Sequence, residues 1–244
     1  MARLLMTAVG AVVRTAAAGS AGASMAPLNN PCLSTPHASL PWCDHTLPVD
    51  ERVADMVSRM NITEKIANLD TQAPAIPSLG LNAYNWWSEA THGLSHVNNS
   101  GTTPGSTNFA FPITTSMSFN RTLWHETGAS ISREARAFMN AGHAYSTYWA
   151  PVINVSPHVH CLLTPETHLC AALMSCQLAR EPRWGRNLES AGEDPYLSGE
   201  YAASFVRGFE HLPDDDRYLA ASACCKHYVA NSMEDSRTVN IHHT

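Results

Sequence analysis

Residues 120–154, NRTLWHETGASISREARAFMNAGHAYSTYWAPVIN, decide the fold, because they predict a long helix that leads directly into a buried strand. Asn120 has the side chain of a helix N-cap, and Gly142 is typical of a helix end. Residues 146–154 are mostly apolar, as expected for a strand that is covered on both faces. The helix positions that share one face are Leu123, Thr127, Ile131, Ala135 and Phe138.

The same alternation of helix and strand continues on both sides of this stretch. Helices are predicted at residues 48–60, after an N-cap at Thr63, and from Asp194 onward, where a proline follows at the first helical position. In the second of these, Ile66 and Leu69 are expected to pack inward. Further strands are predicted at residues 81–87, 109–117 and 219–229. Strands that alternate with helices indicate a parallel sheet with crossover helices, so the predicted fold class is α/β.

The composition excludes several classes of protein. The chain has 244 residues, 44% of them hydrophobic, which is enough for a sizeable core. Its formal net charge of −6 argues against a nucleic-acid partner, which would require a basic face. No apolar run approaches the roughly 20 residues that a membrane span requires. The sequence therefore predicts a globular protein that binds neither nucleic acid nor a membrane.

Polar clusters follow the predicted strands, which is where such folds carry their chemistry. These clusters pair Glu89 with His92, Arg183 with Arg186, and Lys226 with His227. Trp86 and Trp87 precede the first pair and offer flat aromatic surface. Aromatic rings stack on the apolar faces of sugars, and buried donors and acceptors discriminate between hydroxyl positions, so this set favours a carbohydrate ligand. The chain has neither the Gly-rich loop of a phosphate site nor a G-x-S-x-G nucleophile turn.

Four segments in this order resemble the amino-terminal barrel of glycoside hydrolase family 3, in its β-xylosidase-like variety. They are YNWWSEATHG (84–93), FPITTSMSFN (111–120), EPRWGRNLES with AGEDPYL (181–197) and CCKHYVANSMED (224–235). The resemblance runs from about residue 40 to residue 244. It implies a (β/α)8 barrel and a retaining exo-glycosidase that needs no cofactor and no metal.

The resemblance also implies which side chains hold the sugar. Glu89, Arg186, Lys226 and His227 would hold the non-reducing sugar, and Trp87 with Trp86 would shape the pocket. Arg183 would brace the same loop. Taken singly, each of these residues has an ordinary structural alternative as a salt-bridge partner or a core side chain, and the ordered set of motifs is what favours the sugar-binding interpretation.

A retaining glycosidase needs two carboxyl groups about 5–5.5 Å apart, a nucleophile and an acid/base. The resemblance implies that both lie beyond Thr244, so we expect no catalytic residue in the chain and no turnover by it alone. A closed barrel takes about 250 residues and eight strands, whereas four strands are predicted here. Residues 48–244 are therefore expected to form a partial barrel of the first four or so strands, with an exposed edge and a tendency to aggregate.

The amino-terminal region indicates export. In residues 1–24, Arg3 precedes an apolar run and a small-residue stretch, the layout of a signal peptide, which predicts a secreted protein. Residues 25–47 are irregular, and their Cys32 and Cys43 would form a disulfide in an oxidising compartment or remain free thiols otherwise. Glycosylation sequons begin at Asn61, Asn98 and Asn120.

Residues 155–177, VSPHVHCLLTPETHLCAALMSCQ, interrupt the family pattern as an anomalous insert. One interpretation is a metal-binding loop, because the insert is rich in His and Cys, but its spacings match no known zinc pattern. The alternative is a retained intron. Val-Ser and Gln codons can carry the usual ends of an intron, and the length of the insert preserves the reading frame.

The leading functional hypothesis is a β-xylosidase-like glycoside hydrolase that acts on β-linked xylo-oligosaccharides. The sequence leaves open a β-glucosidase of the same family, a non-catalytic sugar-binding fragment and a metal-binding module built on the Cys/His insert.

Overall fold

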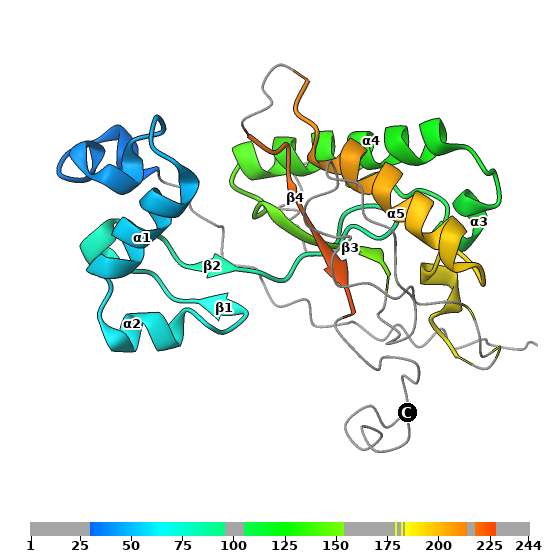
Figure 1. Cartoon of the computed structure of the whole chain (residues 1–244), viewed down its shortest axis with the longest axis horizontal. Coiled ribbons are helices and arrows are strands. Elements are labelled where there is room, and N and C mark those ends of the chain that lie inside the picture. The colour runs from blue at the N-terminus through cyan, green and yellow to red at the C-terminus, as the bar shows by residue number, and fades with distance from the viewer. Residues whose placement is uncertain are drawn as a thin grey trace, which may run out of the picture.

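The structure of the chain, a computed structural model, describes residues 30–95, 105–153, 179, 182, 184–213 and 218–227. Figure 1 shows two groups of elements along the chain: short helices and strands from the first part of the sequence, and a larger group built on two longer helices. The predicted signal peptide (1–24), the predicted insert (155–177), Arg183 and the sequon at Asn98 lie outside the described residues.

Three extended segments lie side by side and are parallel. Strand β3 (Thr147–Val152) pairs in parallel with β4 (Ser222–Lys226), with Thr147 opposite Ser222. On the other edge of β3, the amide of Trp149 donates to the Ser88 carbonyl at 2.7 Å, and Glu89 forms a parallel bridge with Trp149. The predictions of a buried strand at 146–154 and of parallel strands are confirmed, and β4 lies inside the longer strand predicted at 219–229.

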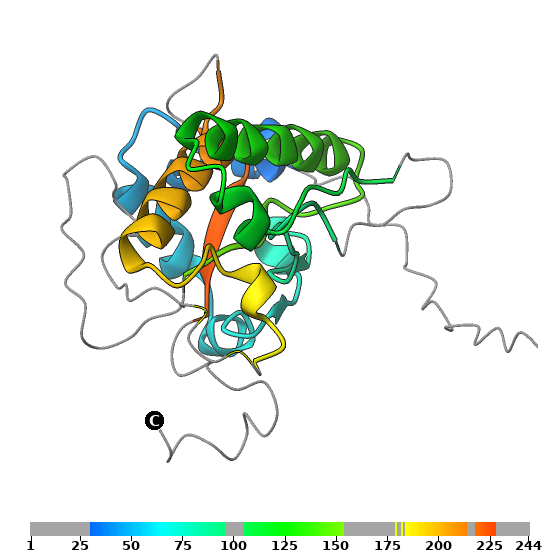
Figure 2. The same cartoon turned by 90° about the vertical axis from the view of Figure 1, so that its right-hand side faces the viewer.

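Two long helices cover one face of these strands, as Figures 1 and 2 show together. Helix α4 (Arg121–Asn140) begins where the side chain of Asn120 accepts a hydrogen bond from the amide of Leu123. Helix α5 (Pro195–Glu210) begins where Asp194 accepts hydrogen bonds from the amides of Tyr196 and Leu197. Both predicted helices are confirmed, because a capping side chain is a local signal that does not depend on the rest of the fold.

The core lies between these helices and the strands. Tyr148 of β3 is fully buried, with its ring 5.9 Å from that of Phe209 on α5, and Phe205 stacks on Phe209 at 5.7 Å. Burying one such aromatic side chain contributes roughly 1.5–3 kcal/mol, so this layer anchors the strands that carry the polar residues discussed below.

The first part of the chain is held by a disulfide between Cys32 and Cys43, which confirms the bonded alternative. It ties together the short 3-10 helices η1 (Pro31–Leu33), η2 (His37–Ser39) and η3 (Pro41–Cys43). Helix α1 (Val49–Arg59) follows, and the amide of Trp42 donates to Asp55 on it at 3.2 Å.

Two predictions about α2 (Ile62–Ala67) are wrong. Its N-cap is Asn61 and not Thr63, because Asn61 and Glu64 form a reciprocal capping box. Ile66 and Leu69 do not pack inward, since they are 62% and 86% exposed.

Two strand predictions also differ from the structure. Residues 109–117 contain helix α3 (Pro112–Ser116), because Pro112 supplies a helical φ at the first position and cannot donate to a strand ladder. Within 81–87 the strand is confined to β2 (Tyr84–Asn85), which pairs antiparallel with β1 (Gln72–Ala73), and 3-10 helix η4 (Pro77–Leu79) lies between the two. The extended segment that joins the parallel layer comes slightly later, at residues 88–90.

None of the described helices combines the length and apolar character that crossing a membrane requires.

Candidate functional site

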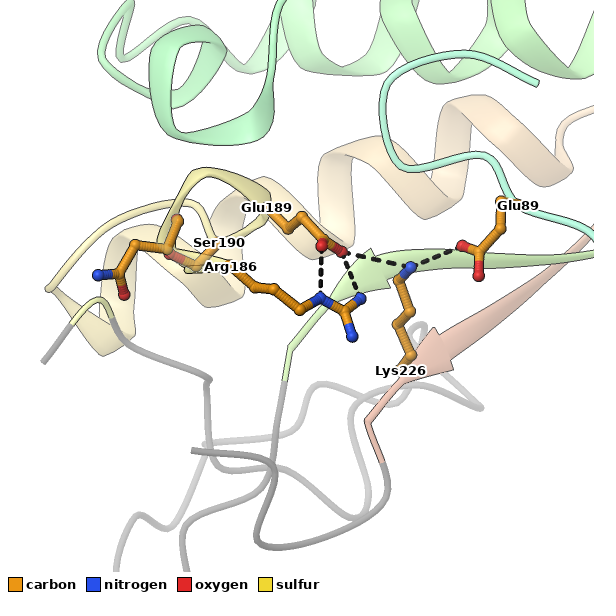
Figure 3. A network of polar contacts seen from close by, with 6 residues as sticks. Glu89, Arg186, Glu189, Ser190 and Lys226 are labelled. Carbon is orange, nitrogen blue, oxygen red and sulfur yellow. Dashed lines mark hydrogen bonds and ion pairs between the residues drawn. The ribbon is translucent and has the colours of Figure 1, made fainter. Parts of the chain in front are cut away.

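Side chains from three separate parts of the chain meet beside the parallel strands (Figure 3). Glu89 comes from the extended segment that bridges to Trp149, and Lys226 is the last residue of β4. Arg186 and Glu189 come from 3-10 helix η5 (Asn187–Glu189) and its N-cap. We call Glu89, Arg186, Glu189 and Lys226 the charge cluster.

The charge cluster consists of two pairs, each held by short, charge-assisted hydrogen bonds, and a longer ion pair joins the two. The ammonium of Lys226 donates to Oε2 of Glu89 at 2.6 Å and lies 3.4 Å from Oε2 of Glu189. Arg186 donates from Nε to Oε1 of Glu189 at 2.5 Å and from Nη2 to Oε2 at 2.7 Å, which is the bidentate geometry that guanidinium and carboxylate groups favour. Figure 3 shows Lys226 between the two carboxylates and Glu189 between the two cations.

Burial makes this pairing necessary. Lys226 is 4% exposed, and an unpaired buried ammonium would be strongly destabilising. The cluster contains two cations and two carboxylates, so its formal charge is balanced. Burial alone would raise the pKa of Glu189, but hydrogen bonds from Arg186 and the nearby charge of Lys226 outweigh burial and hold this pKa below its usual value.

The extended segment that carries Glu89 has one face buried in the core and one open face that is exposed. Ser88 and Ala90 are buried, whereas Trp87 is 52% exposed and Glu89 is partly exposed. Alternate side chains of an extended segment point to opposite faces, so Trp87 and Glu89 share the open one. The ring of Trp87 lies 6.3 Å from the ring of Trp149, the bridge partner of Glu89. An aromatic surface therefore adjoins the charge cluster.

This arrangement is suited to holding a neutral polar ligand. An ammonium has three N–H groups, and within the described residues Lys226 directs them at two carboxylates, so one donor remains for a ligand. Partly exposed carboxylate oxygens beside it can accept hydrogen bonds from hydroxyl groups. Within the described residues, no three His, Cys, Asp or Glu side chains are grouped closely enough to hold a metal ion.

The structure brings together three of the five residues predicted to bind sugar: Glu89, Arg186 and Lys226. Trp87 lies two residues before Glu89 on the open face, and His227 follows Lys226 directly and is half-buried. His92 instead packs its ring against Phe111, at 3.9 Å between ring centres.

Sequence reasoning missed Glu189, which contacts both cations of the cluster. The available signal was its spacing. Residues three apart on a helical turn face the same side, so an Arg followed by Glu at this spacing predicts an ion pair.

Known proteins of similar sequence are β-xylosidases. The chain is 41% identical over 207 residues to "Beta-xylosidase/alpha-L-arabinofuranosidase 1" of Medicago sativa subsp. varia, an alignment that covers 83% of this chain. It is 40% identical over 209 residues to "Beta-D-xylosidase 1" of Arabidopsis thaliana, which covers 84% of this chain. In both cases the chain spans 24% of the length of the relative. No family model matches the chain.

Solved structures of similar fold are also glycosidases. One is a GH3 exo-β-xylosidase in complex with a xylobiose aziridine activity-based probe, with a TM-score of 0.62 and 28% identity over 86% of this chain. Another is β-glucosidase 3B of Thermotoga neapolitana, with a TM-score of 0.54 at 24% identity over 76% of this chain, which bears on the fold alone. The chain covers 26% and 24% of these two structures, respectively.

Proposed function

This chain belongs to glycoside hydrolase family 3, with a β-xylosidase-like sequence, and we propose that it supplies the sugar-holding part of an exo-β-xylosidase that acts on β-linked xylo-oligosaccharides. In this proposal the described parallel strands and helices are the first units of a (β/α)8 barrel. Glu89, Arg186, Lys226 and His227 would hold the non-reducing sugar, and Trp87 would stack on its apolar face.

The observation that carries the proposal is the meeting of Glu89, Arg186 and Lys226. They are far apart in the sequence and come from different elements, yet a hydrogen bond joins Lys226 to Glu89, and an ion pair to Glu189 joins Lys226 to Arg186, beside an exposed Trp. The family resemblance singles out the same three residues from sequence motifs alone. A purely structural ion pair would explain Lys226 and Glu89, but it would not require Trp87 on the same open face.

We also propose that different parts of the family's sequence bind the sugar and cleave its bond. The carboxylates of the charge cluster are engaged by cations, which suits them to hold hydroxyl groups and makes neither of them a ready proton donor. The resemblance assigns the nucleophile and the acid/base to sequence beyond Thr244. The 244-residue chain is therefore expected to bind xylose without hydrolysing an aryl xyloside.

Calorimetric titration of the 244-residue chain with xylose and with glucose tests this proposal. Xylose should bind more tightly than glucose, and Lys226→Met should weaken xylose binding by about tenfold or more, since it removes a charge-assisted hydrogen bond. Lys65→Met makes the same chemical change on α2 and should leave binding unchanged.

Tighter binding of glucose would favour a β-glucosidase, the alternative within the family. Turnover of the aryl xyloside would contradict the proposed division. An unchanged affinity in Lys226→Met would reject the site itself.

We further propose that the protein is secreted and carries N-linked glycans. The Cys32–Cys43 disulfide is typical of an oxidising compartment, and the sequon residues Asn61 and Asn120 are exposed. Each caps a helix through its side-chain oxygen, which leaves the amide nitrogen for a glycan.

Expression through a secretory pathway should give a protein whose mass falls on enzymatic deglycosylation. Thr63→Ala removes the first sequon while keeping the Asn61 cap, so it should remove one glycan without loss of the helix.

A further inference from the structure

The carboxylate of Glu189 contacts both cations of the charge cluster, whereas Glu89 contacts Lys226. We infer that Glu189 is a positioning residue for the sugar site, which fixes the ammonium of Lys226 and the guanidinium of Arg186 at one spacing. The ligand in this inference, a sugar, rests on the proposed function. The contacts of Glu189 with Lys226 and Arg186 do not depend on that proposal.

Two carboxylates restrict the position of the Lys226 ammonium. A lysine side chain is a long, flexible stem that ends in a compact charge, so one carboxylate partner leaves its ammonium able to swing about that partner. Here Glu89 at 2.6 Å and Glu189 at 3.4 Å act on Nζ from two sides. Two partners define the direction of the remaining N–H group, which is the donor available to a ligand hydroxyl.

Glu189 also lies between two positive charges. Arg186 and Lys226 both approach the Oε2 atom of Glu189, so without that carboxylate two positive charges would face each other in a partly buried site. Like charges at such distances repel strongly where water is scarce. Glu189 is held ionised, since Arg186 and Lys226 keep its pKa low despite burial. It therefore allows the two cations to occupy neighbouring positions.

The test compares Glu189→Gln with Glu193→Gln in the full 244-residue chain. Gln at 189 has nearly the same shape and can still accept from Arg186, but it lacks the charge that holds Lys226. Glu193 is an exposed carboxylate in the same loop, so its variant makes the same change in net charge away from the cluster. Glu189→Asp restores the charge on a shorter stem.

The first readout is the rate at which acetic anhydride modifies Lys226, followed by mass spectrometry at fixed pH. Without Glu189, one of the two carboxylates that hold the buried ammonium is missing, so the Lys226 side chain can leave its buried position and be reached by the reagent more often. We expect the Lys226 rate to rise at least threefold in Glu189→Gln, to stay at the wild-type value in Glu193→Gln, and to fall between these two in Glu189→Asp.

The second readout is the dissociation constant for xylose, expected to rise about tenfold in Glu189→Gln. An unchanged Lys226 rate in both Glu189→Gln and Glu189→Asp would overturn the inference, whatever xylose does. A raised rate with unaltered xylose affinity would also overturn it, because Glu189 would then hold Lys226 for structural reasons. If wild type fails to bind xylose while the Lys226 rate responds as expected, the proposed sugar ligand is wrong and the control of Lys226 by Glu189 stands.

Discussion

At the scale of single residues, the chain places charge where burial would normally exclude it. Lys226 is almost fully buried, and it is stable there because Glu89 and Glu189 surround its ammonium. Arg186 completes a balanced set through a bidentate pair with Glu189. The pairing within the cluster thus allows Lys226 to be buried, in addition to forming a candidate binding site.

The lowered pKa of Glu189 predicts how the free energy of unfolding of the chain depends on pH. A carboxyl whose pKa is lower in the folded state than in the unfolded chain contributes stability above its ordinary pKa. That contribution is lost as pH falls through the lower, folded value. The stability difference between wild type and Glu189→Gln should therefore be constant at and above neutral pH and shrink below about pH 4.5, the ordinary value.

Thermal unfolding of both proteins between pH 3 and pH 7 measures this difference, with Glu193→Gln as the control of equal charge. A difference that grows as pH falls would have the wrong sign and would contradict the assigned cause.

At the scale of elements, the packing of α4 against α5 depends on glycine at their closest approach. A Cβ added at Gly208 would clash with the His125 backbone carbonyl, and one at Gly128 would clash with the backbone carbonyl of Phe205. Backbone atoms cannot move aside as a flexible side chain can. The helices approach so closely because neither has a side chain at this point, and their apolar faces then cover the strands that carry Lys226 and Glu89.

Gly208→Ala separates helix propensity from packing, because the two effects have opposite signs. Alanine in a helix interior is favoured over glycine by about 1 kcal/mol, whereas overpacking typically costs about 1–3 kcal/mol. We expect a net loss of stability, measured as a lower thermal midpoint. Gly185→Ala is the matched control, since a Cβ there meets nothing within 4 Å. A raised midpoint in Gly208→Ala would mean that the helices can separate freely.

At the scale of the whole molecule, the first two helices leave apolar side chains in water. Val49 and Val53 of α1 and Ile62 and Ile66 of α2 are all more than half exposed. Several exposed apolar side chains on neighbouring parts of the chain increase the risk of association or aggregation. Edges of parallel strands add to that risk where nothing covers them.

The 244-residue chain is therefore predicted to self-associate. Sedimentation velocity across a concentration series should show species larger than the monomer, and Ile66→Lys should reduce them by placing a charge on the exposed apolar face. Thr63→Lys adds the same charge to an exposed polar position of α2 and should have less effect. A single monomer boundary for wild type at all concentrations would contradict the prediction.

Signals in the sequence were sufficient for the two long helices and for the identity of most cluster residues. Asn120 and Asp194 cap α4 and α5 as predicted, because a cap is made by residues that are close in the chain. Glu89, Arg186 and Lys226 were identified from motifs, and the parallel direction of the strands followed from the alternation of helix and strand.

The tertiary structure decided what depends on partners far apart in the chain. The meeting of Glu89 with Lys226 spans 137 positions, and the role of Glu189 appears only when both cations are placed beside it. The exposure of Ile66 and the shift of the extended segment from 81–87 to 88–90 likewise depend on which neighbours are present. Caps and periodicity act over one or two turns, whereas burial and ion pairing are set by whatever the folded chain brings into contact.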